Sequence, residues 1–169
     1  KPPIGAKIKS GHDMSREFNV LSALDKDYKK SPTPIHYCND KSIIGSDFYI
    51  MERIRGTVLR SNNYKKILTD KTKYNFIASE FVDTLVELHK LNIEKIGLKG
   101  FGRPEGYSSR QVHGWTKRYE NSKTSDIPEI NSVIKWLHEN ITESKYVSLI
   151  HNDFKYDNLV LDSNNLSVK

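Results

Sequence analysis

The sequence predicts an α+β fold with a small sheet-bearing part and a larger, mainly helical part. Three observations lead to this prediction: an amphipathic helical pattern precedes two β-rich segments, longer helical patterns fill the middle of the chain, and short apolar segments close it. The 169 residues suit one domain, and 36% hydrophobic with 28% charged residues is typical of a globular protein.

The N-terminal part is predicted to be a helix followed by a hairpin. Apolar residues recur at three- and four-residue steps from Asp13 to Leu24, and Asp13 is suited to cap this helix. Two prolines in residues 31–34 then interrupt the chain. Residues 35–38 and 48–54 are rich in strand-forming side chains and flank a polar stretch, which predicts an antiparallel hairpin that ends near Gly56.

Helical periodicity dominates the rest of the chain. Its longest run, residues 73–91, keeps one apolar face for four turns and is expected at the centre of the core. A glycine-rich loop follows around residue 100. Helices are then expected from about Ser109 and beside Pro128, a residue that suits a first helical turn. Short apolar segments, expected to be strands, close the chain at residues 147–150, 159–161 and 166–168.

Charge and cysteine content exclude several classes of protein. Lys and Arg total 27 against 21 Asp and Glu, a net +6, but the cations form no basic run. We therefore expect no nucleic-acid partner, because a phosphate-bearing small substrate explains the charge equally well. No apolar run approaches the roughly 20 residues of a membrane span, so no membrane partner is expected. The single cysteine, Cys38, fits a reducing, cytoplasmic location.

The stretch from His151 to Asn158 carries the strongest chemical signal. It matches the H-x-D-x-x-x-x-N catalytic loop of protein kinases and their relatives and lies between two apolar segments. In this interpretation Asp153 accepts the proton of an attacking hydroxyl, and Asn158 offers an amide oxygen to Mg2+. Lys155 neutralises charge on the transferred phosphoryl group, while His151 braces the loop. The alternative is an ordinary polar loop with solvated side chains.

Further motifs occur along the chain. They are Lys-Pro-Pro-Ile-Gly at 1–5, His-Asp-Met-Ser-Arg-Glu-Phe at 12–18, Phe-Tyr-Ile-Met-Glu at 48–52 with Gly56, Gly-Phe-Gly-Arg-Pro-Glu-Gly-Tyr at 100–107, and Arg110 and Gln111 with Trp115. Together with the catalytic loop, the chain resembles the aminoglycoside phosphotransferase (kinase-like) superfamily. The most similar branch contains the kinase-like domain of acyl-CoA dehydrogenase family members 10 and 11 and related bacterial phosphotransferases.

The resemblance implies a fold and its division into lobes. It implies a protein-kinase-like two-lobe fold with ATP as phosphoryl donor and Mg2+ as metal. Residues 1–56 would form a partial, sheet-bearing N-lobe and the hinge, and residues 57–169 a partial helical C-lobe with the catalytic loop.

The resemblance also implies roles for residues outside the catalytic loop. Glu17 would pair with a phosphate-binding basic residue, the alternative being a surface carboxylate. The hinge residues Met51, Glu52 and Ile54 would contact adenine, Glu52 through its carbonyl and Ile54 through its amide, the alternative being an ordinary strand end. Five residues of the loop at 100–107 and the following helix would shape the acceptor site: Arg103, Tyr107, Arg110, Trp115 and Arg118. For Trp115 the alternative is a place in the core.

The resemblance runs out at both ends of the chain. The nucleotide-covering hairpin and the phosphate-binding basic residue of the family precede the Pro-Pro element, so Lys1 is expected to be a neighbour or remnant of that residue. The second metal ligand of the family, an Asp, would follow Lys169, and Asp162 is not expected to replace it. We therefore expect these 169 residues to be a fragment with little or no activity alone.

The sequence thus leads to one principal function and one alternative. The principal function is transfer of the γ-phosphoryl group of ATP to a hydroxyl of a small molecule. The resemblance suggests a hydroxyacyl-CoA as acceptor, and the net charge of +6 argues mildly against polycationic aminoglycosides. The alternative is a non-catalytic nucleotide-binding or partner-binding module with the same fold. The complete set of loop residues argues against it, because binding alone does not require that arrangement.

Overall fold

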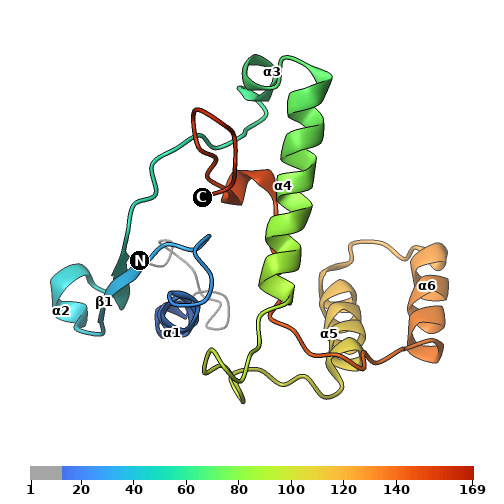
Figure 1. Cartoon of the computed structure of the whole chain (residues 1–169). Helices are drawn as coiled ribbons and strands as arrows, with labels where there is room; N and C mark the ends of the chain where they lie inside the picture. The colour runs from blue at the N-terminus through green and yellow to red at the C-terminus, as the bar shows by residue number, and fades with distance from the viewer. Residues whose placement is uncertain (1–12) are drawn as a thin grey trace. The chain divides into compact units, whose positions relative to one another are not determined.

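The computed structural model describes residues 13–169, so the expectations for the Pro-Pro element and for Lys1 lie outside the described residues. Two compact units are present (Figure 1). Among the described residues, the first contains residues 13–98 together with Ser148–Lys169, and the second is Lys99–Val147. The lobe boundary expected after residue 56 stays a prediction. None of the helices in the described part of the chain is long and apolar enough to span a membrane.

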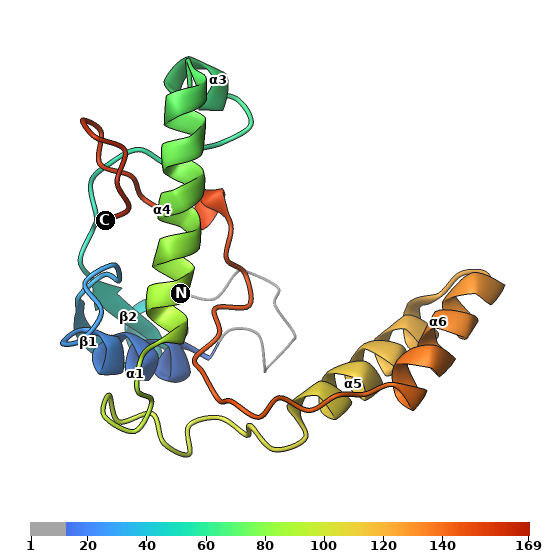
Figure 2. The ribbon, with the colours of Figure 1, turned by 45° about the vertical axis from the view of Figure 1, so that its right-hand side comes forward.

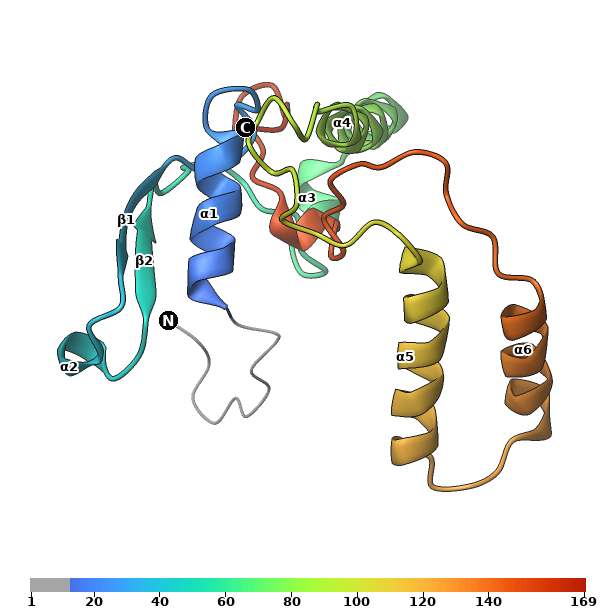
Figure 3. The same cartoon turned by 90° about the horizontal axis from the view of Figure 1, so that it is seen from below.

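The first unit opens with α1 (Met14–Leu24), which begins at Asp13 as the sequence predicts. The Asp13 carboxylate accepts a hydrogen bond from the Arg16 amide at 2.9 Å, so one of the free donors at the helix start is satisfied. The ring centroid of Phe18 lies 5.9 Å from that of Tyr37. Through such contacts α1 packs against a small sheet, as Figure 3 shows.

The sheet consists of β1 (Pro34–Cys38) and β2 (Phe48–Met51), which pair antiparallel and confirm the predicted hairpin. The connection differs from the polar turn that the sequence suggests. It contains a short helix, α2 (Lys41–Ile44), which Asp40 caps and Gly45 ends at a φ of 79°. β2 ends at Met51, three residues before the predicted end at residue 54, so residues 52–54 are not part of the strand.

The core of the first unit lies between α4 (Lys71–His89) and the C-terminal segment, which run beside each other (Figure 2). The short helix α3 (Tyr64–Ile67) precedes α4. The central place predicted for the long helix is confirmed, because α4 contributes Ile77 to a cluster of buried residues: Leu59, Leu68, Ile77, Leu159, Leu161 and Val168. The prediction of a strand at residues 147–150 is wrong, because this segment forms no strand. The segments at 159–161 and 166–168 pair only through isolated bridges at Leu161 and Val168.

The second unit is a pair of helices, α5 (Tyr107–Ser122) and α6 (Pro128–Glu139), that lie side by side. Both helices were predicted, and Pro128 occupies the first turn of α6 as expected. The rings of His113 and His138 join them edge to face, with centroids 4.5 Å apart. The glycine-rich loop before α5 forms turns.

Gly56 lies where the chain, having left the sheet, meets the segment that follows residues 151–158. The Thr57 amide donates to the Leu161 oxygen at 2.7 Å, and the Leu161 amide donates back at 2.8 Å. A Cβ atom on Gly56 would lie 2.3 Å from the Leu161 oxygen and 2.7 Å from Cγ1 of Val160. Since the nearer atom belongs to the backbone, this close approach requires glycine.

We expect Gly56→Ala to lower the free energy of unfolding by about 1–3 kcal/mol, because the backbone at Leu161 must move to admit the new methyl group. The matched control is Gly114→Ala within α5, where a Cβ meets nothing within 4 Å. It should raise that free energy by about 0.5–1 kcal/mol, because alanine favours the helix. Urea unfolding of both variants measures the difference. Effects of the same sign would contradict the close approach at Gly56.

Candidate active site

Residues 151–158 form a tight loop that brings Asp153 and Asn158 of the predicted motif together. The side-chain nitrogen of Asn158, Nδ2, donates to Oδ2 of Asp153 at 2.9 Å and to the Asp153 carbonyl oxygen at 2.8 Å. Asn152 starts the loop in the left-handed region, at a φ of 64°, and the 3-10 turn η1 (Tyr156–Asn158) closes it. A carboxylate and an amide five positions apart in the sequence are therefore in direct contact.

Two further predicted residues contact Asp153. Nζ of Lys155 lies 3.0 Å from Oδ2 of Asp153, and the Asp153 amide donates to Nδ1 of His151 at 3.3 Å. The hydrogen bond from Lys155, followed by that from Asn158, holds the pKa of Asp153 below its ordinary value. The Asp153 side chain is exposed. The loop thus presents an ionised, solvent-accessible carboxylate at neutral pH.

Aromatic contacts join the loop to α4. The ring of Phe81 on α4 lies 4.5 Å from that of Phe154 and 4.6 Å from that of Tyr156, measured between centroids. The His151 ring meets Phe154 edge to face at 5.6 Å. Because Phe81 and Phe154 also pack against the buried cluster, these contacts attach the loop to the core of the first unit.

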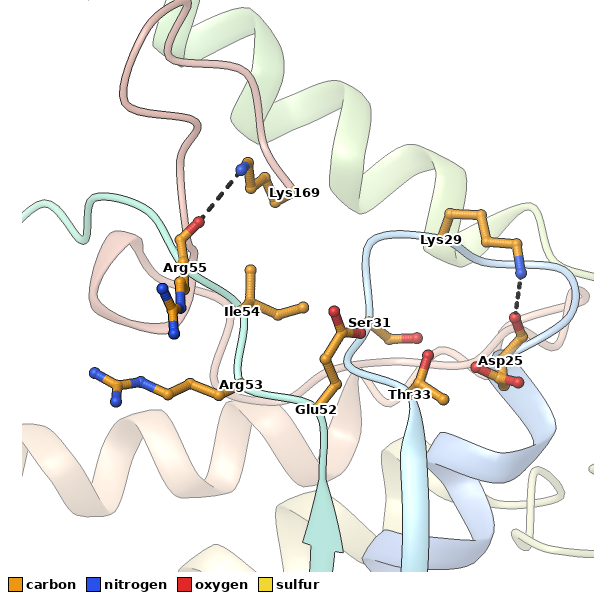
Figure 4. Close-up of a pocket in the computed structure, with 9 residues that line it drawn as sticks. All are labelled: Asp25, Lys29, Ser31, Thr33, Glu52, Arg53, Ile54, Arg55 and Lys169. Atoms are coloured by element: carbon orange, nitrogen blue, oxygen red, sulfur yellow. Dashed lines mark hydrogen bonds between the residues drawn. The ribbon is translucent and has the colours of Figure 1, made fainter.

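Two of the predicted hinge residues line a pocket in the first unit (Figure 4). The pocket has a volume of about 540 Å3, and its other lining residues are Asp25, Lys29, Ser31, Thr33, Arg53, Arg55 and Lys169. Glu52 is fixed by its amide, which donates to the Thr33 oxygen at 2.8 Å, and Ile54 follows two residues later. Met51, the third predicted hinge residue, ends β2 and does not line this pocket.

Glu17 lies on α1 and contacts the sheet. The Tyr49 hydroxyl donates to Oε2 of Glu17 at 3.0 Å. Burial, and next the neighbouring Glu17 carboxylate, raises the pKa of Tyr49 to about 12. The basic partner that the resemblance implies for Glu17 would lie before the described residues, so this pairing stays a prediction.

The candidate acceptor-site residues all lie in the second unit: Arg103, Tyr107, Arg110, Trp115 and Arg118. Arg110 donates to the carbonyl oxygens of Arg103 and Glu105, so its guanidinium closes the glycine-rich loop. The Arg118 guanidinium lies 4.6 Å from the centre of the Trp115 ring. Trp115 is exposed, which disfavours the alternative of a core residue. The substrate role of these residues stays a prediction.

Asp162 begins the turn expected between the last two segments. Its Oδ1 accepts the Asn164 amide at 2.8 Å, and its Oδ2 lies 3.1 Å from Nζ of Lys169. This carboxylate is therefore engaged by its own turn and by Lys169. In the described part of the chain, no three His, Cys, Asp or Glu side chains form a group that could hold a metal ion. The resemblance implies Asn158 as a metal ligand, and this role stays a prediction.

The fold and this loop define a kinase-like α+β domain, and comparison with known proteins agrees. Residues 2–168 match the phosphotransferase enzyme family. The chain is 37% identical over 161 residues to acyl-CoA dehydrogenase family member 11 from Homo sapiens, and 32% identical over 160 residues to member 10 from Mus musculus. Each match covers 95% of this chain, but only 20% and 15% of those proteins.

A solved structure gives the same result. A protein from Ralstonia eutropha, assigned as an aminoglycoside phosphotransferase, superposes with a TM-score of 0.82 and 30% sequence identity. The match covers 92% of this chain and 47% of that one. The chain therefore belongs to the phosphotransferase enzyme family, and the predicted α+β, protein-kinase-like fold and the stated resemblance are confirmed.

Proposed function

We propose that this chain contains the catalytic loop and hinge of an ATP-dependent phosphotransferase, which transfers the γ-phosphoryl group to a hydroxyl of a small molecule. Family membership supports the reaction class. The observation that carries the assignment is the contact between Asn158 and Asp153 at 2.9 Å. In the proposed reaction Asp153 accepts the proton and Asn158 binds Mg2+, and phosphoryl transfer to an alcohol requires two such groups close together.

Asp153 is the proposed acceptor of the proton from the substrate hydroxyl. Asn158 and Lys155 both contact its Oδ2, so Oδ1 is the oxygen that can receive the hydroxyl. A carboxylate with a lowered pKa is a weak base. It therefore orients the hydroxyl early and takes the proton late, which suits the loose transition state of phosphoryl transfer. The Lys155 ammonium would stabilise charge on the phosphoryl oxygens, and His151 would hold the loop.

The oxygen donors at the loop fit Mg2+, a hard cation that prefers carboxylate and amide oxygens. Since Asn158 donates through its nitrogen, its Oδ1 is available for a metal. Bound there, Mg2+ would neutralise the charge of the phosphates.

The pocket lined by Glu52 and Ile54, about 540 Å3, is in the size range of small-molecule sites, and we propose it for adenine. Glu17 is proposed to act on the phosphates through its basic partner.

A hydroxyacyl-CoA is the proposed acceptor. Similar stretches occur in proteins named as acyl-CoA dehydrogenase family members, which supports an acyl-CoA substrate. The net charge of +6 suits the phosphates of CoA. The three arginines of the second unit, Arg103, Arg110 and Arg118, are proposed to contact this substrate along with Tyr107 and Trp115. The single cysteine supports a reducing, cytoplasmic location.

The test is release of ADP by the full-length protein with ATP and a hydroxyacyl-CoA. A matched acyl-CoA without the hydroxyl serves as control, and an aminoglycoside is compared in parallel. We expect ADP release only when the hydroxyl is present, abolished by EDTA and restored by added Mg2+. Binding of ATP without ADP release would instead indicate a non-catalytic module, and a rate independent of Mg2+ would contradict the proposed role of Asn158.

A further inference from the structure

Three aromatic residues form a contact beneath the catalytic loop. Phe81 of α4 meets both Phe154 and Tyr156, at 4.5 and 4.6 Å between ring centroids and with the ring planes tilted by 54° and 44°. Such tilted arrangements are favourable for aromatic pairs. We call Phe81, Phe154 and Tyr156 the aromatic clasp. It joins a helix to a loop more than 70 residues further along the chain.

The clasp and the proposed catalytic residues alternate along the loop. Lys155 is extended, with a φ of −152° and a ψ of 161°. In an extended segment, neighbouring side chains point to opposite sides. Lys155 contacts Asp153, whereas Phe154 and Tyr156, on either side of Lys155, both contact Phe81. One side of this segment therefore serves the reaction, and the other is attached to α4.

Phe81 is itself firmly anchored. It follows Ile77 on α4 by about one helical turn, and Ile77 is only 2% exposed. Thr84, three residues later, is 1% exposed. Phe81 and Phe154 also pack directly against the buried cluster. The interior of the first unit is close-packed around this part of α4, so the Phe81 ring has little room to move. The loop residues that contact this ring are therefore held in place as well.

We propose that Phe81 is a positioning residue for phosphoryl transfer, because it fixes the part of the loop that holds Asp153 in contact with Asn158. This inference rests on the proposed function. Without the Phe81 ring, Phe154 and Tyr156 lose their common partner, and the loop can shift. A shift of about 1 Å in a reacting group can cost up to about 100-fold in rate, so even a partial loss of the clasp is measurable.

The first test is Phe81→Leu in the full-length protein. We expect kcat to fall about tenfold, with little change in the KM for ATP, because none of the clasp residues lines the pocket proposed for adenine. Phe81→Tyr keeps the ring and should restore most of the rate. The matched control is Phe76→Leu, the same substitution on the same helix at an exposed position, which should leave kcat unchanged. Equal falls in the two leucine variants would overturn the proposal.

The second test asks whether the clasp acts as a unit. Tyr156→Leu should slow the reaction, and the double variant with Phe81→Leu should be about as slow as the slower single variant. Fully multiplicative losses would show that the two rings act independently, against the proposal. Unchanged kcat in an active Phe81→Leu protein overturns the positioning role alone, whereas no phosphoryl transfer by the wild-type protein overturns the proposed function and this inference together.

NMR provides a readout that needs no reaction. The Phe81 ring should displace the chemical shifts of the Tyr156 ring protons, and Phe81→Leu should remove that displacement while Phe76→Leu should not. If Phe81→Leu slows the reaction but leaves the Tyr156 shifts unchanged, the clasp is not the cause and the proposal fails.

Discussion

Replacement of Asp153 by Asn is expected to lower kcat by about 1,000-fold, within the range that general-base catalysis contributes. The substitution keeps the size of the side chain but removes the proton acceptor. It also removes the negative charge that pairs with Lys155 at 3.0 Å, so the ammonium is no longer held at the carboxylate. ATP binding should be nearly unchanged, because Asp153 is not part of the pocket lined by Glu52 and Ile54.

The matched control is Asp157→Asn, which makes the same change at an exposed carboxylate of the same loop. It should change kcat by less than about twofold, as expected for a surface substitution. Single-turnover measurement of ADP formation, together with calorimetric titration of ATP, separates the chemical step from binding. Similar losses of rate in the two variants, or loss of ATP binding in Asp153→Asn, would reject Asp153 as the base.

The elements that the sequence predicted are those with local signals. The apolar period of α4 and the capping residue Asp13 of α1 lie within the elements they define, so no distant contact is needed to recognise them. The helix α2 was missed because its signal is short: Asp40 accepts the Ser42 amide at 2.8 Å, within what looked like a polar turn. The strand expected at residues 147–150 failed because β-rich composition does not supply a pairing partner.

The candidate site divides in the same way. The contact between Asp153 and Asn158 could be anticipated, because the residue types and their spacing form a motif with a known chemical purpose. The physical reason for glycine at position 56 could not be anticipated, since it arises from the backbone at Leu161, more than 100 residues away. Phe81 was likewise hidden, because an aromatic residue on the apolar face of a helix is usually an ordinary core residue.

Asn158 is expected to serve the reaction in two ways, which two substitutions can separate. Its nitrogen holds Asp153 at 2.9 Å, and its oxygen is proposed to bind Mg2+. Asn158→Ala removes both groups. We expect it to lower kcat about 100- to 1,000-fold, comparable to loss of an electrostatic stabiliser, and to raise the Mg2+ concentration needed for half-maximal rate. Asn164→Ala, in the turn after Asp162, is the control and should change neither value, because the contact of Asn164 with Asp162 uses its backbone amide.

Asn158→Asp keeps an oxygen ligand but loses the nitrogen that donates to Asp153. It places a second carboxylate beside the first, and their repulsion displaces Asp153 and disfavours its ionised form. The Mg2+ requirement of this variant should therefore remain close to that of the wild type, while kcat falls nearly as far as in Asn158→Ala. The measurement is the initial rate as a function of Mg2+ concentration for each variant. If Asn158→Asp keeps the wild-type rate, the hydrogen bond from nitrogen to Asp153 is dispensable; if Asn158→Ala keeps the wild-type Mg2+ requirement, the metal does not bind at Asn158.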